Sequence, residues 1–347
     1  MEKNINVEVL RIFLTVTVCL HHFRLYSDTF PYGGGYIAVD CFFIISGYYM
    51  AQHIMENKGG SMEGCLRYIY KRYSRLFPGY FLAFVLAFIF RVIAGEFPSG
   101  HWWGYIREAL MIEFWCVDSG QRINPPDWYC GYLLLASGIV YEYVKRMRRS
   151  RSLIYVTGIV VVGVYVVLML YSSNINIYPQ YRCILSAAIL RGIAGLLLGC
   201  WIYLLDKRIC GIISKQNRRI SYIFAGSLSV GFVYILLWKN FLPYVDYFAI
   251  VLFILLFCLA LNIKMNSSHA CFKRIVEYVG KQSYSIYLNH YLIAFIFSKY
   301  MWFKGLDWKE ISLIYLVVVY VFSSGVFLLE RTVLMLCRRM RGKNEEN

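Results

Sequence analysis

Two basic residues interrupt the first long apolar segment of the chain. Arg11 and His22 both lie in VEVLRIFLTVTVCLHHF. Eleven helical steps of about 100° return to the same face, and a rise of about 1.5 Å per residue separates the two side chains by roughly 16 Å. A histidine inside an apolar segment is a candidate general base. His21 points about 100° away from this face and is the poorer candidate.

Asp40 and His290 are the next candidates for acid–base chemistry. Asp40 lies near the start of the second apolar segment, which runs back across the membrane, so its depth is close to that of His22. A carboxylate beside an imidazole fixes the tautomer and raises the basicity, and we therefore predict that Asp40 supports His22. The alternative is that both residues are interfacial groups at span ends. His290 lies midway through SYSIYLNHYLI, and a second histidine within the membrane indicates a polar internal cavity.

Arg72 and Arg75 lie one helical turn apart in KRYSRLFP, before the third apolar segment. Two guanidinium groups on one face suit a phosphate, because each can donate two parallel hydrogen bonds. The alternative is ordinary anchoring by positive charges at the inner membrane surface. Arg191, Glu330 and Arg331 are further charged residues in apolar segments, and the last two can reach the interface by snorkelling.

The composition predicts the fold class. The chain has 347 residues, of which 59% are hydrophobic and 16% are charged, whereas soluble domains contain roughly 25% charged residues. We predict an all-α integral membrane protein that forms a single domain over residues 1–347, a bundle of about ten transmembrane helices in a lipid bilayer. The predicted spans are Val7–Leu25, Gly35–Ile54, Leu76–Ala94, Trp128–Val144, Leu153–Tyr171, Ile184–Leu205, Ile220–Trp238, Tyr247–Ile263, Ser283–Phe297 and Ile311–Leu329.

The positive charges predict the orientation. With the N-terminus inside, the inner loops hold about 24 of the 36 Lys and Arg residues and the outer loops about 8. This asymmetry predicts that both termini are cytoplasmic, including a short tail over 338–347. It also explains the net charge of +16 without a nucleic-acid partner. The outer segment Glu96–Asp127 is predicted to hold an amphipathic or re-entrant piece.

The cysteines show no spacing suited to zinc, and no metal site is predicted. Cys116 and Cys130 both fall on the predicted outer side, where they could pair.

Four elements in this order resemble the membrane-bound acyltransferase 3 family. They are an Arg followed after ten residues by His (Arg11, His22), the stretch AVDCFFIISGYY, the R-x-x-R-x-x-P element (Arg72, Arg75, Pro78), and GKQSYSIYLNH. The resemblance covers nearly the whole chain, and the family's late acidic residue corresponds to Glu330. The chain lacks the acidic W-S-L-x-x-E stretch that many members carry before the fourth span, and it lacks the extracellular hydrolase-like domain of longer members.

The resemblance implies an O-acyltransferase of a bacterial-type plasma membrane. The implied donor is acyl-CoA, most often acetyl-CoA, and the implied acceptor is a hydroxyl of an exported or lipid-linked cell-surface glycan. Arg11, Arg72 and Arg75 are the expected donor-binding residues. His22, Asp40, His290 and Glu330 are the expected catalytic residues, with His22 as general base or acyl carrier. The alternative function is a transporter or flippase, but the chain shows no inverted repeat and no broken helix.

Overall fold

The computed structural model describes residues 4–56, 64–96, 102–112, 122–176, 187–213, 218–238, 243–263, 270–300, 303 and 305–345. Across these ranges the chain is helical and contains no strand, which confirms the predicted all-α class. The helices are α1 (Ile5–Phe23), α2 (Ile37–Glu56), α3 (Cys65–Ile93), α4 (Trp102–Ala109), the 3-10 turn η1 (Pro125–Asp127), α5 (Trp128–Met147), α6 (Leu153–Tyr171), α7 (Ala187–Ile213), α8 (Arg218–Trp238), α9 (Val245–Asn262), α10 (Ala270–Tyr300) and α11 (Trp308–Glu345).

Each of the ten predicted spans overlaps one of these helices. Among the described residues, eight helices are long and apolar enough to cross a membrane, namely α1, α2, α3, α6, α7, α8, α9 and α11. Helices α5 and α10 fall outside that group because they carry charged and polar side chains along with apolar ones. In α10 many of these polar side chains are buried inside the bundle. The protein is therefore a multi-pass membrane bundle with a polar interior.

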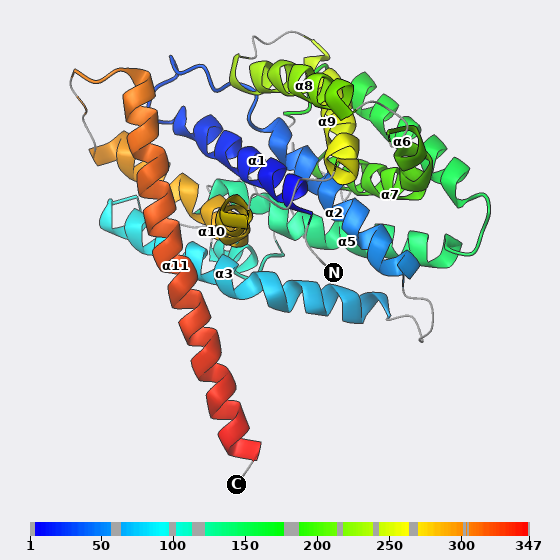
Figure 1. The fold of residues 1–347 in the computed structure, drawn as a ribbon. Coiled ribbons are helices and arrows are strands. Elements are labelled where there is room, and N and C mark those ends of the chain that lie inside the picture. The colour runs from blue at the N-terminus through cyan, green and yellow to red at the C-terminus, as the bar shows by residue number, and fades with distance from the viewer. Residues whose placement is uncertain are drawn as a thin grey trace.

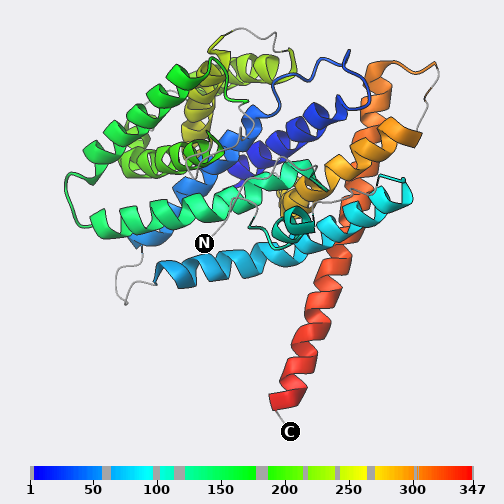
Figure 2. The same ribbon diagram turned by 180° about the vertical axis from the view of Figure 1, so that it is seen from behind.

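Helices α1 and α2 lie at the centre of the bundle (Figure 1). Helix α1 packs on α10, which packs on α11, whereas α2 packs on α7 with α5 and α6 beyond it. Helix α3 packs against α5, α10 and α11. The C-terminal part of α11 projects beyond the other helices, as both views show (Figures 1 and 2). His22 of α1 and His290 of α10 are therefore carried by neighbouring helices.

Helix α3 begins eleven residues before the predicted span, at Cys65. The prediction that Arg72 and Arg75 stand at a helix start is therefore wrong, since both lie inside a continuous helix that also contains Pro78. Hydropathy finds only the apolar part of such a helix, because its first turns carry charged and exposed residues between the apolar ones.

Besides the 3-10 turn η1, the predicted outer segment contains one short helix, α4, within residues that the structure describes. Its tryptophans Trp102 and Trp103 are exposed, whereas Tyr105 and Glu108 are buried. The suggested partner of Cys130, Cys116, lies outside the described residues. Helix α4 therefore has one exposed face and one buried face, and the buried face includes the carboxylate of Glu108.

Three glycines let α2 and α7 approach each other closely. A Cβ atom on Gly47 would lie 2.0 Å from the carbonyl oxygen of Leu196, and one on Gly199 would lie 2.0 Å from that of Ile44. A Cβ on Gly195 would lie 2.6 Å from the Cβ of Phe43. Gly195 and Gly199 form a G-x-x-x-G pair, the spacing that brings helix backbones together in membranes. The α2–α7 pair is therefore held at a separation that only glycine permits.

Gly199→Ala is expected to destabilise the protein by about 1–3 kcal/mol, because the added methyl group collides with the α2 backbone. The matched control is Gly163→Ala in α6, where an added Cβ meets nothing within 4 Å. That control should be neutral or slightly stabilising, since alanine favours helix by up to about 1 kcal/mol over glycine. Thermal unfolding in detergent measures both. Equal melting temperatures for the two variants would contradict the close α2–α7 packing.

Candidate active site

The two predicted histidines are in direct contact. Nε2 of His290 lies 3.0 Å from Nδ1 of His22, and the ring centroids are 5.0 Å apart. His22 stands near the end of α1 and is partly exposed, whereas His290 stands within α10 and is fully buried. Sequence reasoning selected both residues, but it did not pair them, because they are 268 residues apart.

Hydrogen bonds to helix carbonyls assign the tautomer of each ring. Nδ1 of His290 lies 2.5 Å from the carbonyl oxygen of Tyr287, so this nitrogen carries the proton and donates it. Its Nε2 therefore has the lone pair and accepts from His22. Nδ1 of His22 also lies 3.1 Å from the carbonyl oxygen of Val18, so its single N–H is shared between this oxygen and Nε2 of His290. A neutral imidazole has only one N–H, and His22 therefore presents an unprotonated Nε2, the atom that a general base needs.

His21 is held differently from His22. Its Nδ1 lies 3.1 Å from the carbonyl oxygen of Tyr32, in the segment between α1 and α2, and its ring packs edge-on against Tyr36. The ring of His21 lies 5.2 Å from that of His22 at an interplanar angle of 76°. The two neighbouring histidines thus point in different directions, as the helix period predicts, and His22 is the one hydrogen-bonded to His290.

The predicted pairing of Asp40 with His22 is wrong. Both carboxylate oxygens of Asp40 accept hydrogen bonds from Arg191, at 3.1 Å from Nε and 2.6 Å from Nη2. Both residues are almost fully buried, and the guanidinium also lies over the ring of Trp128. The reason is the glycine-mediated packing of α2 on α7. Arg191 stands one turn before Gly195 on the same face of α7, so the close approach of the helices turns Arg191 toward Asp40.

Arg191→Met is expected to destabilise the fold by about 3–5 kcal/mol, because it leaves the Asp40 carboxylate buried without its partner. The double variant Asp40→Leu/Arg191→Met should recover much of this loss, since it removes both charges together. Chemical or thermal unfolding in detergent measures the difference. If the double variant is no more stable than Arg191→Met, the ion pair is not the source of the effect.

The three predicted donor-binding arginines lie near one another. Arg75 is exposed and lies within electrostatic range of Arg72 and Arg11. Arg72 donates from Nη1 to the Tyr68 hydroxyl at 3.1 Å and from Nη2 to the Ser46 hydroxyl. Arg11 pairs with Glu8 at 3.0 Å, and 32% of its side-chain surface remains exposed. Converging like charges favour an anionic ligand, and we call Arg11, Arg72 and Arg75 the arginine group.

Glu330 lies toward the arginine group rather than beside the histidines. A Cβ atom on Gly79 would be 2.9 Å from Oε2 of Glu330, so the carboxylate of α11 rests on the bare backbone of α3. Gly79 is one turn after Arg75 on the same face of α3. Its lack of a side chain makes room for the carboxylate at the α3–α11 crossing.

Polar side chains occur along α10 between the level of the arginine group and that of the histidines. The Tyr284 hydroxyl donates to the carbonyl oxygen of Leu76 at 3.1 Å, just after Arg75. His290 is six residues further along α10, a rise of roughly 9 Å. A polar face between α10 and α11 is formed by Gln282, Ser285, Asn289 and Ser323. His290 lies about 100° around α10 from Asn289 and is turned toward α1.

Three atoms of this polar face have unused hydrogen-bonding capacity. Within the described part of the chain, Nε2 of Gln282, the hydroxyl of Ser323 and Oδ1 of Asn289 are buried and have no hydrogen-bond partner. Such groups are uncommon in folded proteins and are costly unless a water or ligand satisfies them. The spacing of Gln282, Ser285 and Asn289 along one helix face is a signal that the sequence carried, but the functional reading of the sequence did not use it.

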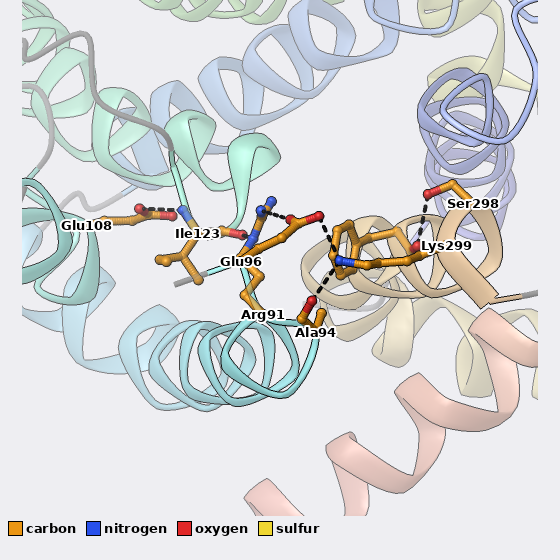
Figure 3. A network of polar contacts seen from close by, with 8 residues as sticks. Arg91, Ala94, Glu96, Glu108, Ile123, Ser298 and Lys299 are labelled. Carbon is orange, nitrogen blue, oxygen red and sulfur yellow. Dashed lines mark hydrogen bonds and ion pairs between the residues drawn. The ribbon is translucent and has the colours of Figure 1, made fainter. Parts of the chain in front are cut away.

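A polar network at the other end of α3 fixes the segment that precedes α5 (Figure 3). Arg91 donates to the carbonyl oxygen of Ile123 at 2.8 Å and pairs with Glu96, which also pairs with Lys299 of α10. The Glu108 carboxylate accepts from the backbone N–H groups of Ile123 at 3.0 Å and Asn124 at 2.7 Å. Burial raises the pKa of the Glu108 carboxyl, although these N–H donors oppose the shift.

The same segment contacts the turn of α10 that carries His290. The Asn124 side chain donates to the carbonyl oxygen of Leu288 at 2.8 Å, and the Tyr287 hydroxyl donates to that of Pro126 at 2.8 Å. These two hydrogen bonds, together with the network in Figure 3 that fixes Ile123, hold the entry to α5 against the histidine level of α10. Glu108 and Asn124 were not selected from the sequence, since nothing in their spacing shows that they meet.

The fold and the geometry of the site define a class of protein. It is a multi-pass membrane protein with a histidine pair that has one free basic nitrogen, a group of arginines, and buried polar side chains on the helix between them. Among the described residues, no cluster of three or more His, Cys, Asp or Glu residues is placed to hold a metal ion.

The chain belongs to the acyltransferase 3 family. The family model, described as an acyltransferase domain, matches residues 4–330, nearly the whole chain. Family membership supports an acyltransferase activity. No curated protein and no solved structure matches the chain.

Proposed function

We propose that this protein transfers an acyl group, most simply acetyl, from cytoplasmic acyl-CoA to a hydroxyl of an exported or lipid-linked cell-surface glycan. One observation carries the proposal: the contact with His290 leaves Nε2 of His22 free as a base, with buried polar side chains of α10 between this level and that of the arginine group. A base, a passage and an anion site are the three parts that such a transfer requires.

The arginine group is suited to the phosphates of CoA. Arg75 is exposed, and Arg11 and Arg72 are partly exposed, so their guanidinium groups can donate to phosphate oxygens. The asymmetry of Lys and Arg among the loops supports a cytoplasmic location for this end of the bundle. CoA is made and used in the cytoplasm, so donor and site are on the same side in this arrangement.

The polar face of α10 is suited to the pantetheine arm of the donor. This arm has two amide groups, each with an N–H donor and a carbonyl acceptor. Nε2 of Gln282 can donate to an amide carbonyl, and Oδ1 of Asn289 can accept from an amide N–H. The arm would then carry the thioester from the arginine group toward His22.

The transfer follows from the assigned tautomers. Nε2 of His22 takes the proton of the acceptor hydroxyl, and the hydroxyl oxygen attacks the thioester carbonyl. The tetrahedral intermediate collapses, the carbon–sulfur bond breaks, and the imidazolium returns its proton to the thiolate of CoA. The alternative role for His22 is that of an acyl carrier, in which Nε2 itself attacks the thioester before the acceptor arrives. Both routes need the lone pair on Nε2.

Transfer is tested with purified protein in proteoliposomes supplied with isotope-labelled acetyl-CoA on one side. The expected result is release of CoA and labelling of a glycan acceptor, detected by mass spectrometry. Comparison of surface glycans from cells with and without the protein identifies the acceptor. Labelled acceptor that crosses the membrane without being acylated would instead indicate a transporter or flippase.

A further inference from the structure

A buried tyrosine of α11 contacts the backbone of both helices that carry the histidines. The hydroxyl oxygen of Tyr315 lies 3.0 Å from the carbonyl oxygen of His290 and 3.2 Å from that of Cys19. Tyr315 is fully buried. Cys19 is three residues before His22 on α1. The single O–H of Tyr315 is therefore shared between these two carbonyl groups in a three-centre hydrogen bond, which links the α1 and α10 backbones at the level of the histidine pair.

The ring of Tyr315 is itself held by residues from the same two helices. It stacks face to face on Phe23 of α1, with centroids 4.0 Å apart and planes at 5°. It also meets Phe297 of α10 edge to face, at 5.6 Å and 78°. Such aromatic pairs contribute beyond their buried area. The position of the hydroxyl is therefore fixed from both sides.

The histidine pair depends on the register of α1 relative to α10. The other polar contacts described for the two rings are to carbonyl groups of their own helices, Val18 for His22 and Tyr287 for His290. These contacts orient each ring on its helix, but they do not set the distance between the helices. A relative shift of about 1 Å would stretch the 3.0 Å contact beyond hydrogen-bonding range.

We propose that Tyr315 is a positioning residue, which holds α1 and α10 in the register that keeps Nδ1 of His22 against Nε2 of His290. A helix carbonyl has a second lone pair beyond its intrahelical bond, so Tyr315 can bond to it without breaking the helix. The effect on catalysis rests on the proposed acyl transfer, whereas the effect on the histidine tautomer does not.

Tyr315→Phe tests the proposal, because it keeps the stacked ring and removes only the hydroxyl. The matched control is Tyr32→Phe, since the Tyr32 hydroxyl is also buried and donates to Ser312 of α11 at 2.8 Å. It does not contact the carbonyl groups of Cys19 or His290 in the described structure. Both variants lose one buried hydrogen bond that involves α11, and similar decreases in melting temperature are expected.

The first measurement is nitrogen-15 NMR of labelled histidines in detergent, with His22 assigned by substitution. In the wild-type protein and in Tyr32→Phe, His22 is expected to give one tautomer, protonated at Nδ1. In Tyr315→Phe its signals should shift or split as the contact with His290 is lost. Phe23→Leu, which removes the stacked ring but keeps the hydroxyl, should give a smaller change and provides the test if Tyr315→Phe does not fold.

The second measurement is the rate of acyl transfer. Tyr315→Phe is expected to lower kcat by about 10- to 100-fold, since small misplacements of catalytic groups have effects of that size. KM for acyl-CoA should be unchanged, because the arginine group is remote from Tyr315. Tyr32→Phe should retain near wild-type kcat.

The outcomes separate the two proposals. If Tyr315→Phe matches Tyr32→Phe in both NMR and kcat, or if neither Tyr315→Phe nor Phe23→Leu alters the His22 signals, the positioning role is overturned. If the tautomer changes as expected but even the wild-type protein transfers no acyl group, Tyr315 positions the histidines and the proposed function fails instead.

Discussion

His22→Ala is expected to lower the rate of acyl transfer by about 10²–10⁴-fold, the usual effect of removing a general base. The expectation rests on the free Nε2 of His22 and on its contact with His290. Acyl-CoA should still bind, because the arginine group is roughly half a bilayer away along α1. Single-turnover transfer and equilibrium binding of CoA measure the two effects separately.

His21→Ala is the matched control for this prediction. It removes a neighbouring imidazole whose Nδ1 bonds to Tyr32 rather than to His290, and it should cost much less. The transfer rate of His290→Ala should lie between those of His22→Ala and His21→Ala. This variant leaves the base in place but removes the imidazole that fixes the tautomer of His22. The hypothesis is falsified if His22→Ala transfers at a near wild-type rate while His21→Ala is inactive.

The double variant Arg72→Ala/Arg75→Ala is expected to weaken acyl-CoA binding by at least tenfold and up to about 10⁴-fold. Each charge-assisted hydrogen bond to phosphate contributes about 1.5–3 kcal/mol, and two arginines are removed. The rate of acyl transfer should fall less at a saturating concentration of acyl-CoA than at a low one, because the histidine pair is intact. Isothermal titration with CoA in detergent measures the affinity.

Arg149→Ala/Arg151→Ala controls for the loss of charge alone. These two arginines are exposed and lie in a loop predicted to be cytoplasmic. Replacing them therefore removes the same amount of positive charge from the same predicted side of the membrane as the Arg72→Ala/Arg75→Ala variant does. Their CoA affinity should match the wild type. If both double variants bind CoA normally, Arg72 and Arg75 serve only as membrane anchors. Arg72→Lys should also weaken binding, since lysine lacks the planar fork that matches a phosphate.

Local patterns in the sequence were enough for the helices, and they selected His22 and His290, which the structure brings into contact. Apolar runs of membrane length predicted a helical bundle, because the bilayer leaves backbone groups no partner except those within the helix. The helix period placed Arg11 and His22 on one face and turned His21 away from it. The predicted third span did not include the charged first turns of α3, because spans were located by their hydropathy. Hydropathy detects the lipid-facing part of a helix and not its polar extension.

The partners of the charged and polar groups were decided only by the tertiary structure. Asp40 was expected beside His22 by depth, but the glycines of α2 and α7 bring Arg191 to it instead. His22 meets His290 across 268 residues. No local rule specifies which helix faces which, because lipid-facing and bundle-facing surfaces are both apolar. The contacts that assign a free lone pair to His22 arise from helix packing. Helix packing also places the hydroxyl of Tyr315 between α1 and α10, the two helices that carry the histidines.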